Sequence, residues 1–246
     1  LNNAGHILGS ATVSIKADNK TIVFSGDIGS NNMPLVKDID YLQSADYVIC
    51  ESTYGNRSHE DTKNRNQKLI EAVKRVTINK STLLITIFAL ERTQDILKVL
   101  NDYYEAHLDS NVPVFLDSPM AAQATKIYKQ NIGYLNEEAQ DTLKRDRDIF
   151  DFPHLKITSQ INQSKKINST DPPKIILAGS GMMEGGRIIH HLSQYISDPK
   201  NHIIFMGYQV PGTLGHLILH GAFDFDYFGR KIEIQAGVEQ IDGFSA

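Results

Sequence analysis

Three polar residues near the start of the sequence follow or flank apolar runs, and all three are of types that bind metal ions. His6 stands in GHILG, Asp27 ends the run KTIVFSGD, and Glu51 follows the run DYVIC. Histidine nitrogen and carboxylate oxygen are donors that zinc accepts, and a carboxylate can bridge two ions. Taken singly, His6 would be an ordinary loop histidine and Asp27 a turn former. Three successive strand ends that each present a donor predict part of a metal site.

The elements that must hold these side chains alternate between short apolar runs and longer segments of helical period. Residues 11–17 and 20–27 predict a hairpin, and residues 45–53 predict a third strand. Later segments predict helices over 61–80, 91–108 and 119–132, strands over 81–89 and 112–118, a helix, short strand and loop over 136–173, a strand, glycine turn and helix over 174–196, a strand and turn over 201–215, and a final strand pair over 230–246. This alternation predicts an α/β fold with a mainly parallel sheet.

Composition limits the class of protein. The chain has 246 residues, of which 41% are hydrophobic and 22% charged, enough for one large domain or two smaller ones. Its apolar runs are shorter than the roughly 20 residues that a bilayer requires, so we expect a cytoplasmic protein with no membrane contact. The single cysteine, Cys50, excludes an internal disulfide and is predicted to be a buried small hydrophobe. A net charge of -4 argues against polyanion binding over the whole surface, but leaves room for a locally basic groove.

A glycine-rich turn offers a place for phosphate. AGSGMMEGGR leaves an apolar run and enters a predicted helix, so the amides of Ser180, Gly181 and Met182 are candidates for binding an anion at the helix start. The alternative is that the glycines only permit a tight turn. Arg187, and Arg92 in FALERTQ, are candidates for phosphate contacts or, equally, for ion pairs with neighbouring side chains.

Eight short motifs occur in an order that resembles one known family. They are GHILGSA, SGD, ESTYG, FALERTQ, LDSPMA, GSGMMEGGR, GYQVPGTLG and GFSA. In this order they resemble the β-CASP branch of the metallo-β-lactamase superfamily, which contains RNA-processing nucleases related to the endonuclease subunit of the cleavage and polyadenylation specificity factor. The resemblance implies a partial metallo-β-lactamase αββα half over residues 1–55, an inserted β-CASP α/β domain over 56–243, and the start of a further metallo-β-lactamase segment over 244–246.

The resemblance also implies chemistry for individual residues. Members of the family bind two zinc ions and hydrolyse RNA phosphodiesters. His6 matches a zinc-ligand histidine, Asp27 matches the aspartate that bridges the two ions, and Glu51 matches an acidic residue that orients a histidine which protonates the leaving oxygen. Two metals neutralise charge on the attacking and leaving oxygens of such a displacement. His6 and Asp27 are therefore predicted metal ligands, Asp27 and Glu51 are predicted catalytic residues, and RNA is the predicted partner.

Other parts of the family pattern are missing from this sequence. The principal cluster, His-x-His-x-Asp-His, does not occur among its nine histidines, and the sequence stops before the histidine that follows GFSA in relatives. We therefore interpret it as an internal fragment in which two zinc ions lack closed coordination. The pairs His190 and His191, and His216 and His220, are interpreted as surface or packing histidines. Sheet edges exposed by truncation predict a homodimer.

Three functions remain open at this point. The first is a zinc-dependent ribonuclease, cutting internally or from a 5′ end, of which this piece alone is inactive. The second is a non-catalytic RNA- or partner-binding module. The third, a hydrolase of small esters or phosphates, is disfavoured by the β-CASP segment. The sequence also departs from relatives at Thr86 and Gly179, where proline is usual, and at Glu91, where glycine is usual. We expect Glu91 to add a negative charge near the RNA groove.

Overall fold

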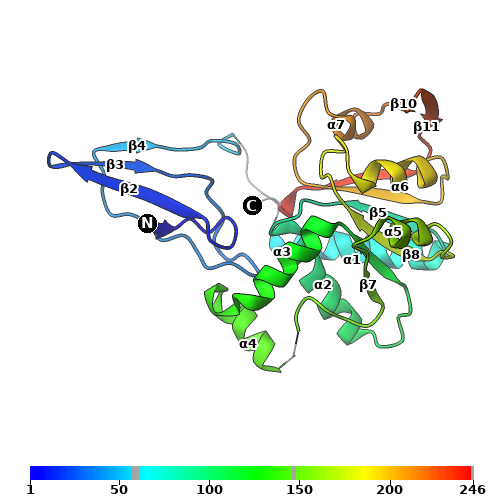
Figure 1. Cartoon of the computed structure of the whole chain (residues 1–246), viewed down its shortest axis with the longest axis horizontal. Helices are drawn as coiled ribbons and strands as arrows, with labels where there is room; N and C mark the ends of the chain where they lie inside the picture. Colours follow the sequence, from blue (N-terminus) through cyan, green and yellow to red (C-terminus); the bar gives the residue numbers. More distant parts are fainter. Residues whose placement is uncertain (57–60, 146–147, 245–246) are drawn as a thin grey trace. The chain divides into compact units, whose positions relative to one another are not determined.

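Residues 1–56, 61–145 and 148–244 are described by a computed structural model of the chain (Figure 1). These residues form two compact units. Unit 1 contains residues 1–56, 127–145 and 148–149, and unit 2 contains residues 61–126 and 150–244. The division places residues 127–145 and 148–149 with the amino-terminal residues, which a single boundary at 55/56 does not anticipate. The domain assignments made from the sequence stay predictions, and residues 245 and 246 of the expected third segment lie outside the described residues.

Unit 1 is built on a small sheet with strand order β1-β2-β3-β4. The strands are β1 (Asn2–Asn3), β2 (Ala11–Ala17), β3 (Lys20–Phe24) and β4 (Tyr47–Ile49). The predicted hairpin is confirmed, since β2 and β3 pair antiparallel. Its turn residues Asp18 and Asn19 have φ of 48° and 56°, the left-handed values that a tight two-residue hairpin turn requires. Strand β4 then pairs parallel with β3.

A short helical segment completes unit 1. It contains the 3₁₀ turn η1 (Ile132–Tyr134) and helix α4 (Glu137–Arg145). Leu35 anchors this segment, because its carbonyl accepts a hydrogen bond of 2.8 Å from the Asn136 amide and its side chain is fully buried. Val36 forms a bridge with Leu135 beside it. Residues 33–36 and 132–139 are thus held together by backbone pairing as well as by apolar burial.

Cys50 corrects one expectation from the sequence. It is exposed and follows β4, whose residues Tyr47, Val48 and Ile49 are 60%, 62% and 54% exposed. Strand β4 lies at the edge of its sheet, and no described element covers these side chains. The apolar run DYVIC therefore predicted the strand correctly but not its burial, because burial depends on which elements pack against the strand.

Unit 2 contains a six-stranded sheet with the order β12-β9-β5-β8-β6-β7, in which every pair of neighbours is parallel. The strands are β5 (Thr82–Thr86), β6 (Val114–Asp117), β7 (Leu155–Ile157), β8 (Lys174–Ala178), β9 (His202–Met206) and β12 (Gly237–Ile241). Strands β5, β8 and β9 are buried along their whole length, as expected for a parallel sheet covered on both faces. The predicted α/β fold with a mainly parallel sheet is confirmed.

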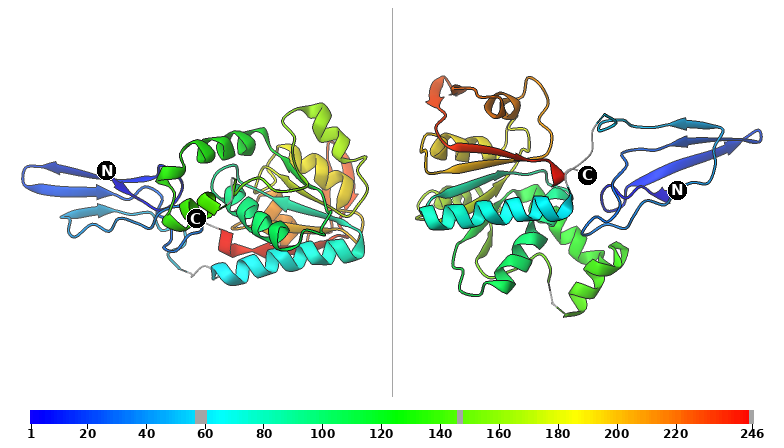
Figure 2. Two further views of the ribbon diagram at one scale, coloured as in Figure 1. Left: turned by 90° about the horizontal axis from the view of Figure 1, so that it is seen from below. Right: turned by 180° about the vertical axis from the view of Figure 1, so that it is seen from behind.

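Helices cover this sheet on both faces. They are α1 (Thr62–Asn79), α2 (Arg92–Ala106), α3 (Pro119–Gln130), α5 (Ile161–Ile167), α6 (Arg187–Tyr195) and α7 (Leu214–Leu219). Helix α1 lies on one face, while α5 and α6 lie on the other (Figures 1 and 2). Leu69, Val73 and Val76 form the buried stripe of α1 that the sequence predicts. On the opposite face, Leu84 and Ile176 of the sheet join Leu192 of α6 in one buried apolar cluster.

Several elements escape the sequence prediction. Helices α5 and α7 are short, and strand β10 (Asp224–Tyr227) was not anticipated. Strand β11 (Arg230–Glu233) pairs with β10, whereas β12 pairs with β9 and leads into the 3₁₀ turn η2 (Asp242–Phe244). The expected final strand pair is therefore wrong, because each member finds a partner elsewhere.

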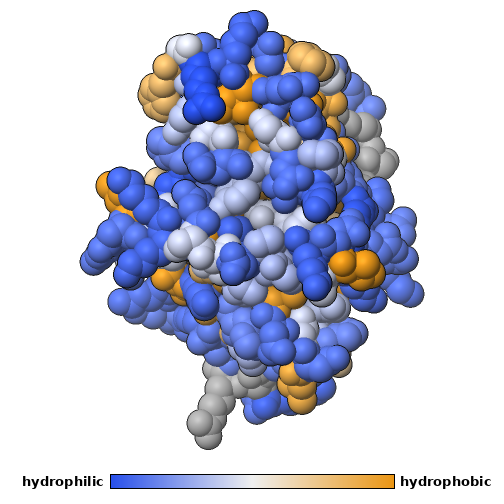
Figure 3. Space-filling model, turned by 90° about the vertical axis from the view of Figure 1, so that its right-hand side faces the viewer, coloured by the Kyte–Doolittle hydropathy of each residue, from blue (hydrophilic) through white to orange (hydrophobic). Residues whose placement is uncertain are grey.

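No helix in the described part of the chain is both long and apolar enough to cross a membrane. The face of the molecule drawn in Figure 3 is mostly hydrophilic, with hydrophobic side chains gathered in small separate patches. Single apolar side chains scattered over a surface are common in proteins.

A buried ion pair joins α1, α2 and the carboxyl-terminal turn of unit 2. Arg65 Nη2 lies 3.2 Å from Asp95 Oδ2, and both side chains are at most 1% exposed. Arg65 Nη1 donates to the Gly243 carbonyl, and the guanidinium lies over the ring of Phe244 at 4.4 Å. Burial raises the pKa of Asp95 to about 6, although the charge of Arg65 opposes the rise. A buried charge of this kind becomes very unfavourable when its partner is removed.

Replacing Arg65 by methionine should therefore lower the free energy of unfolding by about 3 kcal/mol or more, because Asp95 loses its partner and the Gly243 carbonyl loses its donor. Urea denaturation at pH 7 followed by circular dichroism measures the effect. Arg230→Met, at an exposed position of β11, is the matched control and should change stability by at most about 0.5 kcal/mol. Equal stabilities of the two variants would contradict the role given to Arg65.

Candidate functional site

Four of the motifs found in the sequence follow neighbouring strands at the carboxyl edge of the parallel sheet. The loop 207–213 follows β9, 87–91 follows β5, 179–186 follows β8, and Ser118 follows β6. These four strands are adjacent in the order β9-β5-β8-β6. In open parallel sheets ligands bind outside the carboxyl ends of the strands. The fold thus gathers segments that are far apart in the sequence at the edge where a ligand would bind.

The glycine-rich loop after β8 is closed by its own hydrogen bonds. Ser180 donates its amide to the Gly185 carbonyl at 3.2 Å, and its hydroxyl accepts from the Glu184 amide at 3.0 Å. The Ser180 amide is therefore engaged within the loop rather than directed at an anion in this conformation. The anion-binding roles of Gly181 and Met182 stay predictions.

Two glycines of this loop are required by geometry. A Cβ at Gly181 would lie 2.0 Å from the ring of Phe88, so only glycine allows the loop after β8 to approach the loop after β5. Gly186 has φ of 75° and precedes helix α6 as its N-cap residue. The glycines thus serve a tight, closely packed turn, which is the alternative that the sequence left open.

The two arginine candidates have different surroundings. Arg187 Nη1 donates to Asp117 Oδ1 at 2.6 Å and to the Thr158 carbonyl at 2.8 Å, and its Nη2 donates to the Ser159 carbonyl at 2.9 Å. Arg187 is thus an ion-pair partner in the interior of unit 2. Arg92 places its guanidinium over the ring of Phe88 at 4.1 Å. For both residues the phosphate contact remains a prediction.

Asp117 is the centre of a buried network at the end of β6. Its fully buried carboxylate accepts hydrogen bonds from Ser164 Oγ at 2.6 Å, from His191 Nε2 at 2.7 Å, from Arg187 and from the Thr158 hydroxyl. Burial opposes ionisation, but these four donors together hold the pKa of Asp117 at about 2. The network joins β6 to the end of β7, to α5 and to the first turns of α6.

Asp117 lies in the motif LDSPMA, but no local pattern in the sequence predicts its role. The available signal was a carboxylate at the end of an apolar strand, directly before a helix that begins at Pro119. Its partners lie 41 to 74 residues further along the chain. No local pattern identifies such partners, so the role of Asp117 became visible only in the folded structure.

The predicted metal ligands of unit 1 come together at the ends of its strands. His6 Nε2 lies 3.9 Å from Asp27 Oδ2, and the side chain of Asp27 is 78% exposed. The loops that carry them touch closely: the Gly29 amide donates to the Ala4 carbonyl at 2.9 Å, and a Cβ at Gly29 would lie 1.7 Å from the Gly5 carbonyl oxygen. Glycine at position 29 is therefore needed to bring the two donors together.

Glu51 is held beside the same loops. Its carboxylate accepts from the Thr53 amide at 2.8 Å and from the Ile28 amide at 3.2 Å, next to Asp27 in the chain. The Thr53 hydrogen bond lowers the pKa of Glu51 against the effect of partial burial, with further help from Ile28 and from the charge of His6. The structure thus places all three sequence-predicted residues of unit 1 in one neighbourhood, with Glu51 ionised.

The pair His6 and Asp27 fits a zinc ion in donor type and spacing. Zinc binds histidine nitrogen and carboxylate oxygen at roughly 2.0–2.2 Å, so one ion can contact two donors up to about 4 Å apart. Within the described ranges no group of three histidine, cysteine, aspartate or glutamate side chains is arranged to hold a metal. The described residues therefore offer two donors of the usual four.

The remaining histidine pairs have packing or hydrogen-bonding roles, as interpreted from the sequence. His191 bonds to Asp117, and His190 Nδ1 lies 2.8 Å from the Tyr227 hydroxyl. His216 and His220 stack with ring centroids 4.0 Å apart. These contacts explain the histidines without a metal.

Glu91, which the sequence led us to expect as a negative charge near the RNA groove, is buried in the structure. It is 1% exposed, so its carboxylate does not face solvent at the carboxyl edge of the sheet. Its φ of 55° lies in the region that favours glycine, the residue usual at this position in the family that the sequence resembles. The backbone thus keeps the conformation that glycine would adopt, while the side chain is accommodated in the interior.

A comparison with protein families identifies this architecture. Residues 93–218 match the family model described as the Beta-Casp domain, which covers half of the chain. The chain belongs to the β-CASP family. The match begins in α2 and ends in α7, so it spans the carboxyl-edge loops after β6, β8 and β9 and the whole Asp117 network.

Relatives of the β-CASP chain extend the similarity into unit 1. It is 36% identical over 242 residues to a protein named Ribonuclease TTHA0252 from Thermus thermophilus, covering 98% of this chain and 56% of the relative. It is 35% identical over 248 residues to an RNase J-like protein of Methanocaldococcus jannaschii, covering 99% and 56%. It is 31% identical over 258 residues to Transcription termination factor FttA of the same organism, covering 100% and 40%. The chain spans about half the length of the first two relatives.

The Asp117 network predicts a pH-dependent contribution to stability. The pKa of Asp117 falls from 3.8 to about 2 on folding, which corresponds to about 2 kcal/mol of stability. Because the folded pKa is depressed, this contribution is present above about pH 4 and is lost as the pH falls towards 2. Asp117→Asn should be less stable than the unmodified chain at pH 7, and the gap should narrow by about 2 kcal/mol in acid. Urea denaturation across this pH range measures it.

The exposed Asp109, replaced in the same way, is the matched control and should show little effect at any pH. A stability gap for Asp117→Asn that stays constant from pH 7 to the acid limit would contradict the low pKa.

Proposed function

We propose that this chain is part of a zinc-dependent ribonuclease that hydrolyses RNA phosphodiesters. The observation that carries the proposal is the convergence of His6, Asp27 and Glu51 from three separate segments, with the two donors 3.9 Å apart and Glu51 ionised beside them. Membership of the β-CASP family and similarity to proteins named ribonuclease and RNase J-like support it. The complete protein would hold two zinc ions, and the 246-residue chain alone would be inactive.

Each residue of unit 1 has a distinct part in this proposal. His6 and Asp27 would hold zinc, with Asp27 free to bridge because its carboxylate is largely exposed. Zinc would supply a Lewis acid and an activated water at neutral pH. Glu51 keeps acceptor capacity on both oxygens after the Ile28 and Thr53 amides are bound, so it can orient an imidazole that donates a proton to the leaving oxygen.

Unit 2 would supply the binding surface for RNA. Its carboxyl-edge loops present backbone groups at the edge of a parallel sheet, where ligands bind in folds of this kind. The ion pair of Arg187 with the buried Asp117 fixes the start of α6, directly after the glycine loop 179–186. We propose that this rigid edge places phosphate groups through Gly181, Met182 and Arg92.

A second candidate function is a non-catalytic RNA- or partner-binding module. One observation favours it: within the described residues only two donors meet, which is too few for a closed zinc site. A relative is named as a transcription termination factor. Metal content and cleavage measured on the same samples separate the two functions.

The test compares the 246-residue chain with the full product of its gene. The full product should contain two tightly bound zinc ions and cleave labelled RNA, whereas the chain alone should retain at most one zinc after washing with chelator and should not cleave. Asp27→Ala in the full product should lose zinc and activity, because it removes the bridging donor. The exposed Asp109→Ala is the matched control and should keep both. A full product that binds RNA without zinc and without cleavage would instead establish the non-catalytic module.

Glu51 tests the mechanism more finely. In the full product Glu51→Gln should slow single-turnover RNA cleavage by about 100-fold, the lower range for a positioned acid or base, while zinc content and RNA affinity stay nearly unchanged. Glutamine keeps the size of the side chain but lacks the charge that orients an imidazolium. Cleavage at the unmodified rate would show that Glu51 serves only the local backbone, and loss of zinc would assign it to the metal site.

A further inference from the structure

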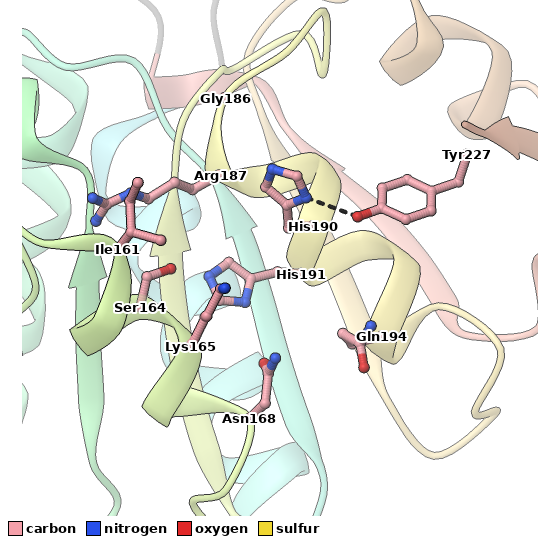
Figure 4. A pocket seen from close by; sticks show the side chains of 10 residues that line it. All are labelled: Ile161, Ser164, Lys165, Asn168, Gly186, Arg187, His190, His191, Gln194 and Tyr227. Atoms are coloured by element: carbon pink, nitrogen blue, oxygen red, sulfur yellow. Dashed lines mark hydrogen bonds between the residues drawn. The ribbon is translucent and has the colours of Figure 1, made fainter.

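A cavity of about 620 Å³ lies between α5 and α6 on the face of the sheet opposite α1. Figure 4 shows side chains from both helices and Tyr227 of β10 around it. Its polar lining includes Ser164, Lys165 and Asn168 from the α5 segment, and His190 and Gln194 from α6. The volume is within the range of small-molecule sites. The proposed function does not use this cavity.

The floor of the cavity is rigid. Ser164 and His191 both line it and both donate to the buried carboxylate of Asp117, at 2.6 and 2.7 Å. Arg187, at the start of α6, bonds to the same carboxylate and to the Thr158 carbonyl. The spacing of the two helices is therefore fixed by hydrogen bonds before any ligand binds, which reduces the entropy that binding would cost.

The charge of the lining favours an anion. Among the described residues no carboxylate lines the cavity, although aspartate and glutamate outnumber lysine and arginine by 29 to 25 in the whole chain. The charge of Arg187 is balanced by Asp117, but Lys165 forms no ion pair with any described residue. Lys165 thus gives the cavity a local positive charge in a chain that is negative overall.

Tyr227 lines the cavity, and the neighbouring Phe228 lies next to His190 of the lining. The hydroxyl of Tyr227 bonds to His190 Nδ1 at 2.8 Å, and the next residue, Phe228, is 84% exposed at the tip of the β10-β11 hairpin. The ring of Phe228 is nearly parallel to that of His190, at 12° with centroids 6.4 Å apart. Bases of single-stranded RNA stack on exposed aromatic rings such as that of Phe228. Lys165 and the carboxamides of Asn168 and Gln194 in the cavity lining could bind the polar parts of a nucleotide.

We propose that this cavity binds a nucleotide unit of single-stranded RNA. A base would stack on the exposed ring of Phe228, Asn168 and Gln194 would bond to its polar edge, and Lys165 would contact the phosphate. The inference rests on the proposed function in that RNA is the substrate class, and it adds a second contact to RNA on unit 2. A free nucleotide offers the same chemistry, so the test includes both sources.

The test uses the 246-residue chain, a fluorescein-labelled oligouridylate of about ten nucleotides, and uridine 5′-monophosphate as the free nucleotide. Phe228→Ala and Lys165→Ala should each weaken oligouridylate binding by about 10-fold in fluorescence anisotropy, as expected for loss of one stacked base or one phosphate contact. Lys165→Ala should also reduce the dependence of binding on salt. The matched controls are Phe223→Ala, 71% exposed at the other end of the hairpin, and Lys166→Ala, exposed on α5 outside the cavity.

The outcomes separate the possibilities. Oligouridylate binding weakened by the two test variants and not by the controls supports the RNA site. Binding of the monophosphate, lost in the same variants, with no effect on oligouridylate would replace RNA by a free nucleotide as the ligand. Unchanged binding of both probes in the test variants, or no binding of either probe to the unmodified chain, would overturn the inference. Failure of this inference is distinguishable from failure of the proposed function. If the cavity binds neither probe but the full gene product shows zinc-dependent cleavage, the proposed function still holds. If the full gene product does not cleave RNA but Phe228→Ala weakens oligouridylate binding, the cavity site still holds.

Discussion

The structure of unit 2 depends on one buried carboxylate. Asp117 ends β6, an interior strand of the parallel sheet, and without donors its charge would be very costly in that environment. Four side chains, from the end of β7, from α5 and from α6, donate hydrogen bonds to this carboxylate. These bonds tie the middle of α5 and the first turns of α6 to the sheet, and they hold the end of the glycine loop and the floor of the α5-α6 cavity. The glycine-loop edge and the cavity that we connect to RNA on unit 2 thus rely on a carboxylate to which we assign no part in the reaction.

Much of this fold could be predicted from local sequence. Strands such as β5 and β8 are continuous apolar runs, and α1 carries its buried stripe at helical spacing. Helix α5 escaped because INQSKKI has little apolar periodicity and is defined instead by a capping box of Gln160 and Gln163. Strand β10 was missed because the sequence pattern pairs β11 with β12, whereas in the structure β11 pairs with β10. Such choices between partners are settled by tertiary packing, which a local pattern does not contain.

The site shows the same division. The types of His6, Asp27 and Glu51 were sufficient to predict a shared neighbourhood, since each follows a strand or turn where loops meet. The engagement of the Ser180 amide by Gly185 was not predictable, because a glycine loop can direct its amides inward or outward with the same sequence. The role of Asp117 was not predictable either, because its hydrogen-bond donors lie 41 to 74 residues away in the sequence. Local patterns therefore identify donors, while the folded chain decides which donors are already used.

The ionisation of Asp117 in the folded chain is the most direct test of this account. Nuclear magnetic resonance of the aspartate carboxyl carbons, followed from neutral pH into acid while the protein remains folded, reports that titration site by site. The account predicts that the Asp117 signal stays that of a carboxylate well below pH 3.8 and begins to change only as the pH approaches about 2. A midpoint at or above 3.8 would show that the four donors do not stabilise the charge, and would contradict the account.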